Sequence, residues 1–197
     1  MNGSHEPAHF ERLYQSNPDP WGYLTSSYEA AKYGHALEVL GDARFSNGLE
    51  VGCSIGVLTR MLAARCDALL GLDVVDQALE DATARCSDQF WVHFEKMRVP
   101  AAWPSGRFDL IVLSEVLYFL VPADIERMAA HVASSLMVGA RVLLVNWLGK
   151  ANDPCSGGEA AERFIQASAG HLTPSHQDHR PGYRIDLLVA RGDNMIA

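Results

Sequence analysis

The stretch that decides the fold is Leu49-Glu50-Val51-Gly52-Cys53-Ser54-Ile55-Gly56. It joins a short apolar segment to an amphipathic segment that begins at Val57. Glycines at such a junction let the backbone turn tightly and let a ligand lie against it with no Cβ in the way. The pattern predicts a strand, a glycine-containing turn, and a helix whose first N–H groups face an anionic group of a ligand.

Downstream of this turn, short apolar runs alternate with amphipathic stretches. The apolar runs cover 49–51, 68–72, 90–94, 108–113 and 142–147, and the helical stretches between them cover 57–66, 77–86 and 123–136. Continuous Val, Ile and Leu runs indicate strands buried on both faces, as parallel strands covered by helices are. The alternation therefore predicts a doubly wound α/β sheet with right-handed crossovers.

The N-terminal and C-terminal parts of the chain do not continue this alternation. A short helix is expected over 10–14, ended by the prolines of 17–20, and a second from Ser26 to about residue 40, with Glu29 as the capping-box partner of Ser26. Residues 159–169 are expected to be helical. In 183–190, apolar and charged side chains alternate. This alternation predicts a strand near a sheet edge, the last of an antiparallel hairpin.

Composition and charge narrow the classes of function. The 197 residues are 48% hydrophobic and 20% charged, which suits one globular domain. The net charge is −8 and Lys and Arg do not cluster, which disfavours a nucleic-acid substrate and favours a neutral or cationic small molecule. No apolar run reaches the roughly 18 residues of a membrane span, and the first residues do not resemble a signal peptide. We therefore expect a cytoplasmic protein with four free cysteines.

An acidic residue follows the glycine turn at the distance that nucleoside-binding folds use. Asp73 ends the apolar run 69–73, where its carboxylate can accept hydrogen bonds from two ribose hydroxyls. This pairing fits either a dinucleotide or S-adenosylmethionine. The dinucleotide fingerprint G-x-G-x-x-G requires a glycine where this chain has Ser54. A nicotinamide oxidoreductase is therefore disfavoured.

The spacing of Gly52 and Gly56, preceded by Glu50, resembles motif I of the class I S-adenosylmethionine-dependent methyltransferases, with its central glycine replaced. Residues 108–118 (FDLIVLSEVLY) resemble the fourth strand of that family, and 138–144 resemble its turn into strand five. The resemblance spans about 49–145. It implies a Rossmann-like class I fold: a mostly parallel seven-stranded sheet, helices on both faces, and an antiparallel C-terminal strand. It also implies S-adenosyl-L-methionine as cofactor and S-adenosyl-L-homocysteine as product.

Four segments outside these core motifs are more specific to one family: 10–14, 19–23, 28–33 and 183–188. Together with the core, they make nearly the whole chain resemble the nodulation protein S family of rhizobia. That resemblance implies an N-methyltransferase of Nod factor synthesis. The acceptor would be the free amine of the non-reducing glucosamine of an N-deacetylated chitooligosaccharide. It further implies one methyltransferase domain over 1–197, with a helical cap segment (1–42), a cofactor-binding core (43–150) and a C-terminal helix with the last strands (151–197).

The cofactor-binding residues expected from the motif and its surroundings are Trp21, Lys32, Glu50, Gly52, Cys53, Ser54, Gly56, Asp73, Val74, Met97, Arg98 and Ser114. Trp21 offers an aromatic face to a sulfonium, and Lys32 a cation to the methionine carboxylate, with an exposed lysine as the alternative. Many relatives carry an acidic residue that contacts the adenine, but 97–104 contain none. Adenine would then be held by a backbone group and packed by Met97 or Trp103, either of which can instead belong to the core.

The catalytic candidates are Glu115 and Tyr118, just past the carboxyl end of the fourth strand. Glu115 is suited to accepting the amine proton or to holding the ammonium, and Tyr118 to lining the same pocket. The alternatives are an exposed carboxylate at a strand end and a tyrosine packed under the following helix. His171, His176 and His179 fit no helix face and have no cysteine pair nearby, so we expect substrate contact or solvent exposure there, and no metal.

Three other functions compete with amino-sugar methylation. The chain could methylate another small molecule, at oxygen or at a different amine. It could be a non-catalytic module that binds S-adenosylmethionine or senses a nucleotide, although such a relative is expected to lose the glycine turn or Asp73, and this chain keeps both. It could also use a nicotinamide, which a binding assay with both cofactors would exclude. The sequence leaves the oligomeric state open.

Overall fold

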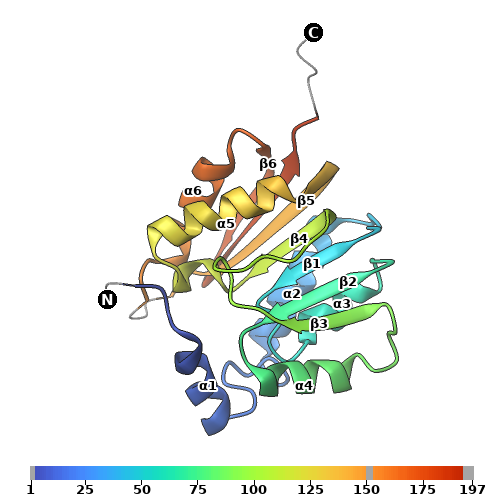
Figure 1. The fold of residues 1–197 in the computed structure, drawn as a ribbon, viewed down its shortest axis with the longest axis vertical. Helices are drawn as coiled ribbons and strands as arrows, with labels where there is room; N and C mark the ends of the chain where they lie inside the picture. Colours follow the sequence, from blue (N-terminus) through green and yellow to red (C-terminus); the bar gives the residue numbers. More distant parts are fainter. Residues whose placement is uncertain (1–2, 150–152, 193–197) are drawn as a thin grey trace.

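In a computed structural model, the described residues 3–149 and 153–192 form a seven-stranded sheet with helices on both faces (Figure 1). The strands are β1 (Gly48–Val51), β2 (Leu69–Asp73), β3 (Val92–Lys96), β4 (Phe108–Ser114), β5 (Leu136–Trp147), β6 (Leu172–Arg180) and β7 (Tyr183–Ala190). Their order is β3-β2-β1-β4-β5-β7-β6. The first five are parallel, and β7 is antiparallel to both β5 and β6. The predicted fold class is confirmed.

The helices divide between the two faces of this sheet. They are α1 (Pro7–Ser16), α2 (Ser27–Leu40), α3 (Val57–Ala63), α4 (Asp76–Arg85), the 3-10 turn η1 (Leu117–Phe119), α5 (Pro122–Ser134) and α6 (Gly157–Ser168). α5 and α6 place Met128 and Phe164 in one buried apolar cluster, and α2 and α3 place Leu40 and Leu62 in another. None of the described helices combines the length and apolar character that crossing a membrane requires.

The N-terminal helices begin and end close to where the sequence signals place them. α1 ends at Ser16, before the Asn17-Pro18 pair. The Ser26 hydroxyl accepts the N–H of Glu29 at 3.3 Å, as predicted for the start of α2. The reciprocal half of the predicted capping box is wrong, because the Glu29 carboxylate lies 2.7 Å from the Lys32 ammonium instead. α1 packs through Tyr14 against Ile55 and Val75, and so covers the carboxyl ends of β1 and β2.

The C-terminal hairpin differs from the sequence prediction in one respect. β7 is the last strand of a hairpin and lies next to the edge strand, between β5 and β6, as predicted; the difference is that both of its faces are buried. Its charged residues are buried, because Arg184 donates to Asp186 at 2.7 Å and to Glu162 of α6 at 2.5 Å. The edge is β6, whose side chains are mostly exposed and which includes Pro174, a residue tolerated at sheet edges. The proposed boundary at 150–151 lies outside the described residues, and the division into three segments stays a prediction.

Candidate functional site

The glycine turn after β1 is shaped by two close approaches. Gly52 has φ +79°, and a Cβ there would lie 2.3 Å from the Val116 side chain, so only glycine lets the turn pass the end of β4. Gly56 has φ +77°, and a Cβ there would lie 2.9 Å from Ala82 of α4. Gly56 therefore serves the packing of α3 on α4, whereas Gly52 borders a cavity.

Asp73 at the end of β2 holds the glycine turn in place. Its carboxylate accepts the backbone N–H groups of Ser54 at 3.0 Å, Val74 at 2.7 Å and Val75 at 3.0 Å. Burial raises the pKa of Asp73, and the three N–H groups act in the opposite direction. Oδ1 accepts two of these bonds and Oδ2 only one, so Oδ2 keeps room for a further donor, such as a ribose hydroxyl.

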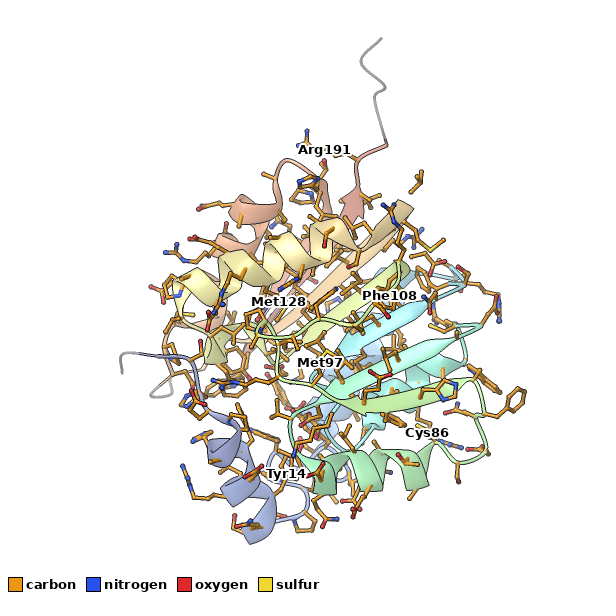
Figure 2. The ribbon with its side chains drawn as sticks, in the orientation of Figure 1. Tyr14, Cys86, Met97, Phe108, Met128 and Arg191 are labelled. Atoms are coloured by element: carbon orange, nitrogen blue, oxygen red, sulfur yellow. The ribbon has the colours of Figure 1, made fainter. Side chains whose placement is uncertain are left out.

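A first cavity opens at this end of the sheet. It is bordered by the glycine turn, the ends of β2 and β4, the segment after β3, and α1. Of the predicted cofactor residues it is lined by Trp21, Gly52, Ser54, Asp73, Val74, Met97, Arg98 and Ser114. The cavity has a volume of about 100 Å³, and Tyr14 of α1, labelled in Figure 2, is among its lining residues. The Tyr14 hydroxyl lies 2.5 Å from the Ser54 hydroxyl.

Four predicted cofactor residues do not line the first cavity. Glu50 and Cys53 are buried, with 1% and 3% of their surface exposed, and Gly56 packs on α4. Lys32 lies in a second cavity, where two carboxylates engage its ammonium. Trp103 is also placed elsewhere: its indole N–H donates to Ser135 at 3.2 Å and its ring stacks on His131.

Glu50 is the most deeply buried acid beside the turn. Burial raises the pKa of its carboxyl to about 8, so the group is mostly neutral at neutral pH. A carboxyl whose pKa is raised in the folded state stabilises the protein fully below its unfolded pKa of about 4.3, and this contribution is lost as the pH rises through the folded value. The structure thus predicts that the unfolding free energy falls between about pH 4.5 and pH 8 because of Glu50.

In Glu50→Gln that pH dependence is expected to disappear. The variant should gain on the wild type as the pH rises, on the order of 3 kcal/mol between pH 5 and pH 9. Urea unfolding at both pH values measures the difference. Glu80→Gln, an exposed position on α4, is the matched control and should follow the wild type. Parallel pH curves for Glu50→Gln and wild type would contradict the assignment.

The second cavity is larger, about 820 Å³, and adjoins the first. Its walls come from α1, the segment 21–23, α2, η1 and the end of β5. The residues that line both cavities are His5, Trp21, Tyr23, Glu115, Tyr118 and Phe119. The two cavities therefore meet just past the carboxyl end of β4, where both predicted catalytic residues lie.

A buried polar cluster lies at this meeting point. The Glu115 carboxylate, on a residue with φ +58°, accepts hydrogen bonds from the Lys32 ammonium at 2.5 Å, the Tyr118 hydroxyl at 2.8 Å and the backbone N–H of Trp147 at 2.9 Å. Lys32 also lies 2.7 Å from Glu29. Two carboxylates thus share one ammonium, and the cluster carries one net negative charge toward the second cavity.

The pKa values in this cluster follow from burial and from the shared charge. Burial lowers the pKa of Lys32, but Glu115 and Glu29 outweigh it and the pKa is raised overall. Burial also raises the pKa of Glu29, against the opposing effect of Lys32. The pKa of Tyr118 lies well above its ordinary value, because the hydroxyl is buried and donates to Glu115. Lys32 therefore stays charged and Tyr118 stays protonated at neutral pH.

Sequence reasoning missed several residues of this site. The sequence signals predict only a helix-capping role for Glu29, although its position three residues before Lys32 places both on one side of a helix. Tyr14, Tyr23 and Trp147 line the cavities or contact the site from segments distant in sequence. No local pattern marks these three, because their placement depends on how α1, the segment between α1 and α2, and β5 pack.

The comparisons with known proteins show the family of this chain. The family described as Nodulation protein S (NodS) matches residues 9–144. Nodulation protein S of Bradyrhizobium diazoefficiens is 38% identical over 120 residues, which cover 58% of this chain and 54% of that protein. Its counterpart in Sinorhizobium fredii is 32% identical over 120 residues, covering 60% and 56%. The match thus spans about half the length of these curated relatives.

Solved structures show the same fold. The N-methyltransferase NodS from Bradyrhizobium japonicum WM9, in complex with S-adenosyl-L-homocysteine, superposes with a TM-score of 0.80 at 21% identity, over 94% of this chain and 99% of that one. A putative methyltransferase from Pseudomonas syringae gives 0.74 at 29% identity, over 83% and 99%. The fold is the Rossmann-like class I methyltransferase fold.

Proposed function

The chain belongs to the nodulation protein S family, and on this premise we propose that it is an S-adenosylmethionine-dependent N-methyltransferase. The proposed acceptor is the free amine of the non-reducing glucosamine of an N-deacetylated chitooligosaccharide, an intermediate of Nod factor synthesis. The proposed site of reaction is the cytoplasm. The observation that carries the proposal is the meeting of two cavities at Glu115 and Tyr118.

The first cavity suits the methyl donor. Asp73 Oδ2 offers an acceptor to a ribose hydroxyl, and Val74 and Met97 offer apolar contacts to the adenine. The Ser114 hydroxyl is buried and, among the described residues, has no hydrogen-bond partner, so it is free to bind a polar group of the ligand. S-adenosylmethionine supplies an electrophilic methyl group on a sulfonium, which leaves the protein to position and desolvate the two reactants.

The second cavity suits a cationic sugar. Its aromatic side chains, Trp21, Tyr23 and Trp147, offer faces on which sugar rings stack. The net negative charge of the Glu29, Lys32 and Glu115 cluster attracts an ammonium. An acceptor amine drawn to Glu115 would lie where the two cavities meet, facing the methyl donor.

The same polar cluster is suited to removing a proton from the acceptor amine. The amine must be neutral when its nitrogen forms the new bond to the methyl carbon, and glucosamine amines titrate not far above neutrality. The carboxylates of Glu115 and Glu29 are positioned to hold the ammonium and to receive its proton. Lys32 and Tyr118 keep the Glu115 carboxylate oriented toward the cavities.

The test is transfer of labelled methyl from S-adenosylmethionine to chitooligosaccharides. Fully acetylated chains are compared with chains deacetylated at the non-reducing end, and we expect label only on the latter. Equal label on both would contradict the amine as acceptor. No label with cofactor binding intact would contradict the amino-sugar substrate, and absence of cofactor binding would contradict the methyltransferase itself.

The variant Glu115→Gln tests, in the same assay, whether the carboxylate at the junction of the two cavities takes part in the reaction. We expect turnover to fall by at least about tenfold, because the variant loses the charge that holds the ammonium, while the Kd of S-adenosylhomocysteine stays within about twofold. Glu126→Gln, an exposed residue on α5, is the control and should behave as wild type. Unchanged turnover in Glu115→Gln across the pH range would remove Glu115 from the reaction.

A further inference from the structure

Two histidines and an aspartate converge at the edge of the sheet, away from the cavities described above. His176 and Asp178 lie two residues apart on β6, and His35 lies on α2. The ligand atoms of the three side chains all lie within 4.8 Å of one another. The spacing of His171, His176 and His179 along the chain predicts no metal site, but the fold places different residues together, and we propose that His35, His176 and Asp178 form a binding site for a divalent transition metal.

The register of the hairpin explains why these side chains share one face. His176 pairs with Leu187 and Asp178 pairs with Ile185, and both partners belong to the apolar cluster beneath α2. His179 pairs with Arg184 instead, whose guanidinium contacts Glu162 of α6 on the opposite face. Residues 176 and 178 therefore face α2, and His179 faces away from it.

The ring of His35 is already oriented for this role. Its Nδ1 lies 3.1 Å from the Tyr183 hydroxyl, while its Nε2 lies 3.4 Å from Asp178 Oδ2. Metal-binding histidines characteristically use one nitrogen for the metal and the other for a second polar partner that fixes the ring. The His35 side chain is 14% exposed and that of Asp178 26%, so two of the three ligands are held by packing before any metal arrives.

The ligand set indicates the kind of metal. Two imidazoles and one carboxylate suit Zn²⁺, which takes nitrogen and oxygen ligands in a tetrahedral arrangement, with water in the fourth position. Ca²⁺ and Mg²⁺ prefer oxygen ligands throughout and are not expected. Arg180 donates to Asp178 Oδ2 at 2.9 Å, but its side chain is half exposed. It can move aside, or it can keep Oδ2 while Oδ1 binds the metal.

A metal at this site would connect the edge strand β6 to the helix α2. β6 is the edge strand and is hydrogen-bonded to β7 alone among the described strands. α2 carries Glu29 and Lys32 of the polar cluster within two turns of His35. Binding would thus stabilise the helix that forms one wall of the second cavity, whatever substrate that cavity takes.

The experiment uses tag-free protein stripped of metal by a chelator and titrated with ZnCl₂ by calorimetry. We expect one Zn²⁺ per chain and a Tm raised by a few degrees at saturation. His176→Asn and Asp178→Asn are each expected to weaken binding by at least about tenfold and to remove the Tm shift. His179→Asn, on the same strand but the opposite face, should bind as wild type.

Three results would overturn the proposal. The first is no Zn²⁺ binding to the wild-type protein. The second is binding that His176→Asn leaves unchanged, as expected if the ion were held elsewhere, for example at the stacked His5 and His9 pair. The third is equal weakening by His176→Asn and His179→Asn, which would indicate nonspecific surface binding. Circular dichroism confirms that each variant is folded, and the exposure of His176 and His179 makes folding defects unexpected.

Discussion

Asp73→Ala is expected to weaken S-adenosylhomocysteine binding by at least about a hundredfold, because one carboxylate holds both the glycine turn and the ligand. Alanine leaves the N–H groups of Ser54, Val74 and Val75 without their acceptor. Each buried donor left unpaired costs about 1–3 kcal/mol, and the lost ribose hydrogen bonds cost a similar amount. The turn that faces the ligand is therefore expected to lose its shape as well as its partner.

Calorimetric titration with S-adenosylhomocysteine measures this loss, with urea unfolding to show that the variant is folded at the temperature used. Asp73→Asn is a second variant that keeps one acceptor oxygen for the turn, so it should remain folded while still binding more weakly. Asp76→Ala is the matched control, three residues further on, where an exposed carboxylate forms an ion pair with Lys96. Unchanged affinity in a folded Asp73→Ala protein would remove Asp73 from the site.

The strands and helices of the core could be predicted from sequence because their signals are local. The run 108–113 is apolar except for Asp109 and lies in the central strand β4, whose other residues are buried. The same reasoning placed Gly52 at a tight turn and Asp73 at the end of the next strand. Each of these depends on neighbours along the chain, which sequence periodicity reports directly.

The C-terminal hairpin shows where that reasoning fails. Arg184 and Asp186 alternate with apolar residues, which is typical of a strand with one face in water. Their charges pair with each other and with Glu162, so both faces of β7 are buried. The partner Glu162 lies 22 residues away on α6, and no local pattern reports such a pairing.

The polar cluster at the meeting of the two cavities shows the same limit. Lys32 was expected to meet a carboxylate of the cofactor, and a lysine on a helix near the site is compatible with that role. In the structure it meets two carboxylates of the protein, Glu29 one turn earlier and Glu115 83 residues away. The role of Lys32 depends on which carboxylate lies nearest to its ammonium. The packing of the folded chain determines this, and the local sequence does not report it.

Lys32→Met is expected to destabilise the protein by about 3–5 kcal/mol at pH 7 and above, because it leaves two carboxylates buried without their cation. Methionine fills a similar volume, so the effect is electrostatic rather than a cavity effect. Lys96→Met, which removes one partner of an exposed pair with Asp76, is the control and should change stability by less than about 1 kcal/mol. Urea unfolding of the three proteins measures the difference.

The dependence of the free energy of unfolding on pH distinguishes the loss of the Lys32 charge from a loss of packing. Without Lys32, burial and mutual repulsion raise the pKa of Glu29 further above its ordinary value, so the folded variant binds a proton that the unfolded chain releases near pH 4.3. A raised folded pKa means that stability is retained below the unfolded pKa and lost as the pH rises through the folded one. The deficit of Lys32→Met should therefore be small near pH 4.5 and grow toward pH 8.

The double variant Lys32→Met, Glu29→Gln tests whether repulsion between the Glu29 and Glu115 carboxylates causes the loss of stability. Removing one of the two opposed carboxylates is expected to recover at least half of the lost stability at pH 8, because Glu115 still accepts hydrogen bonds from Tyr118 and Trp147. A deficit that is equal at pH 4.5 and pH 8, or that Glu29→Gln fails to reduce, would mean that Lys32 acts through packing alone. The shared ammonium would then no longer explain why two acids can be buried where the cavities meet.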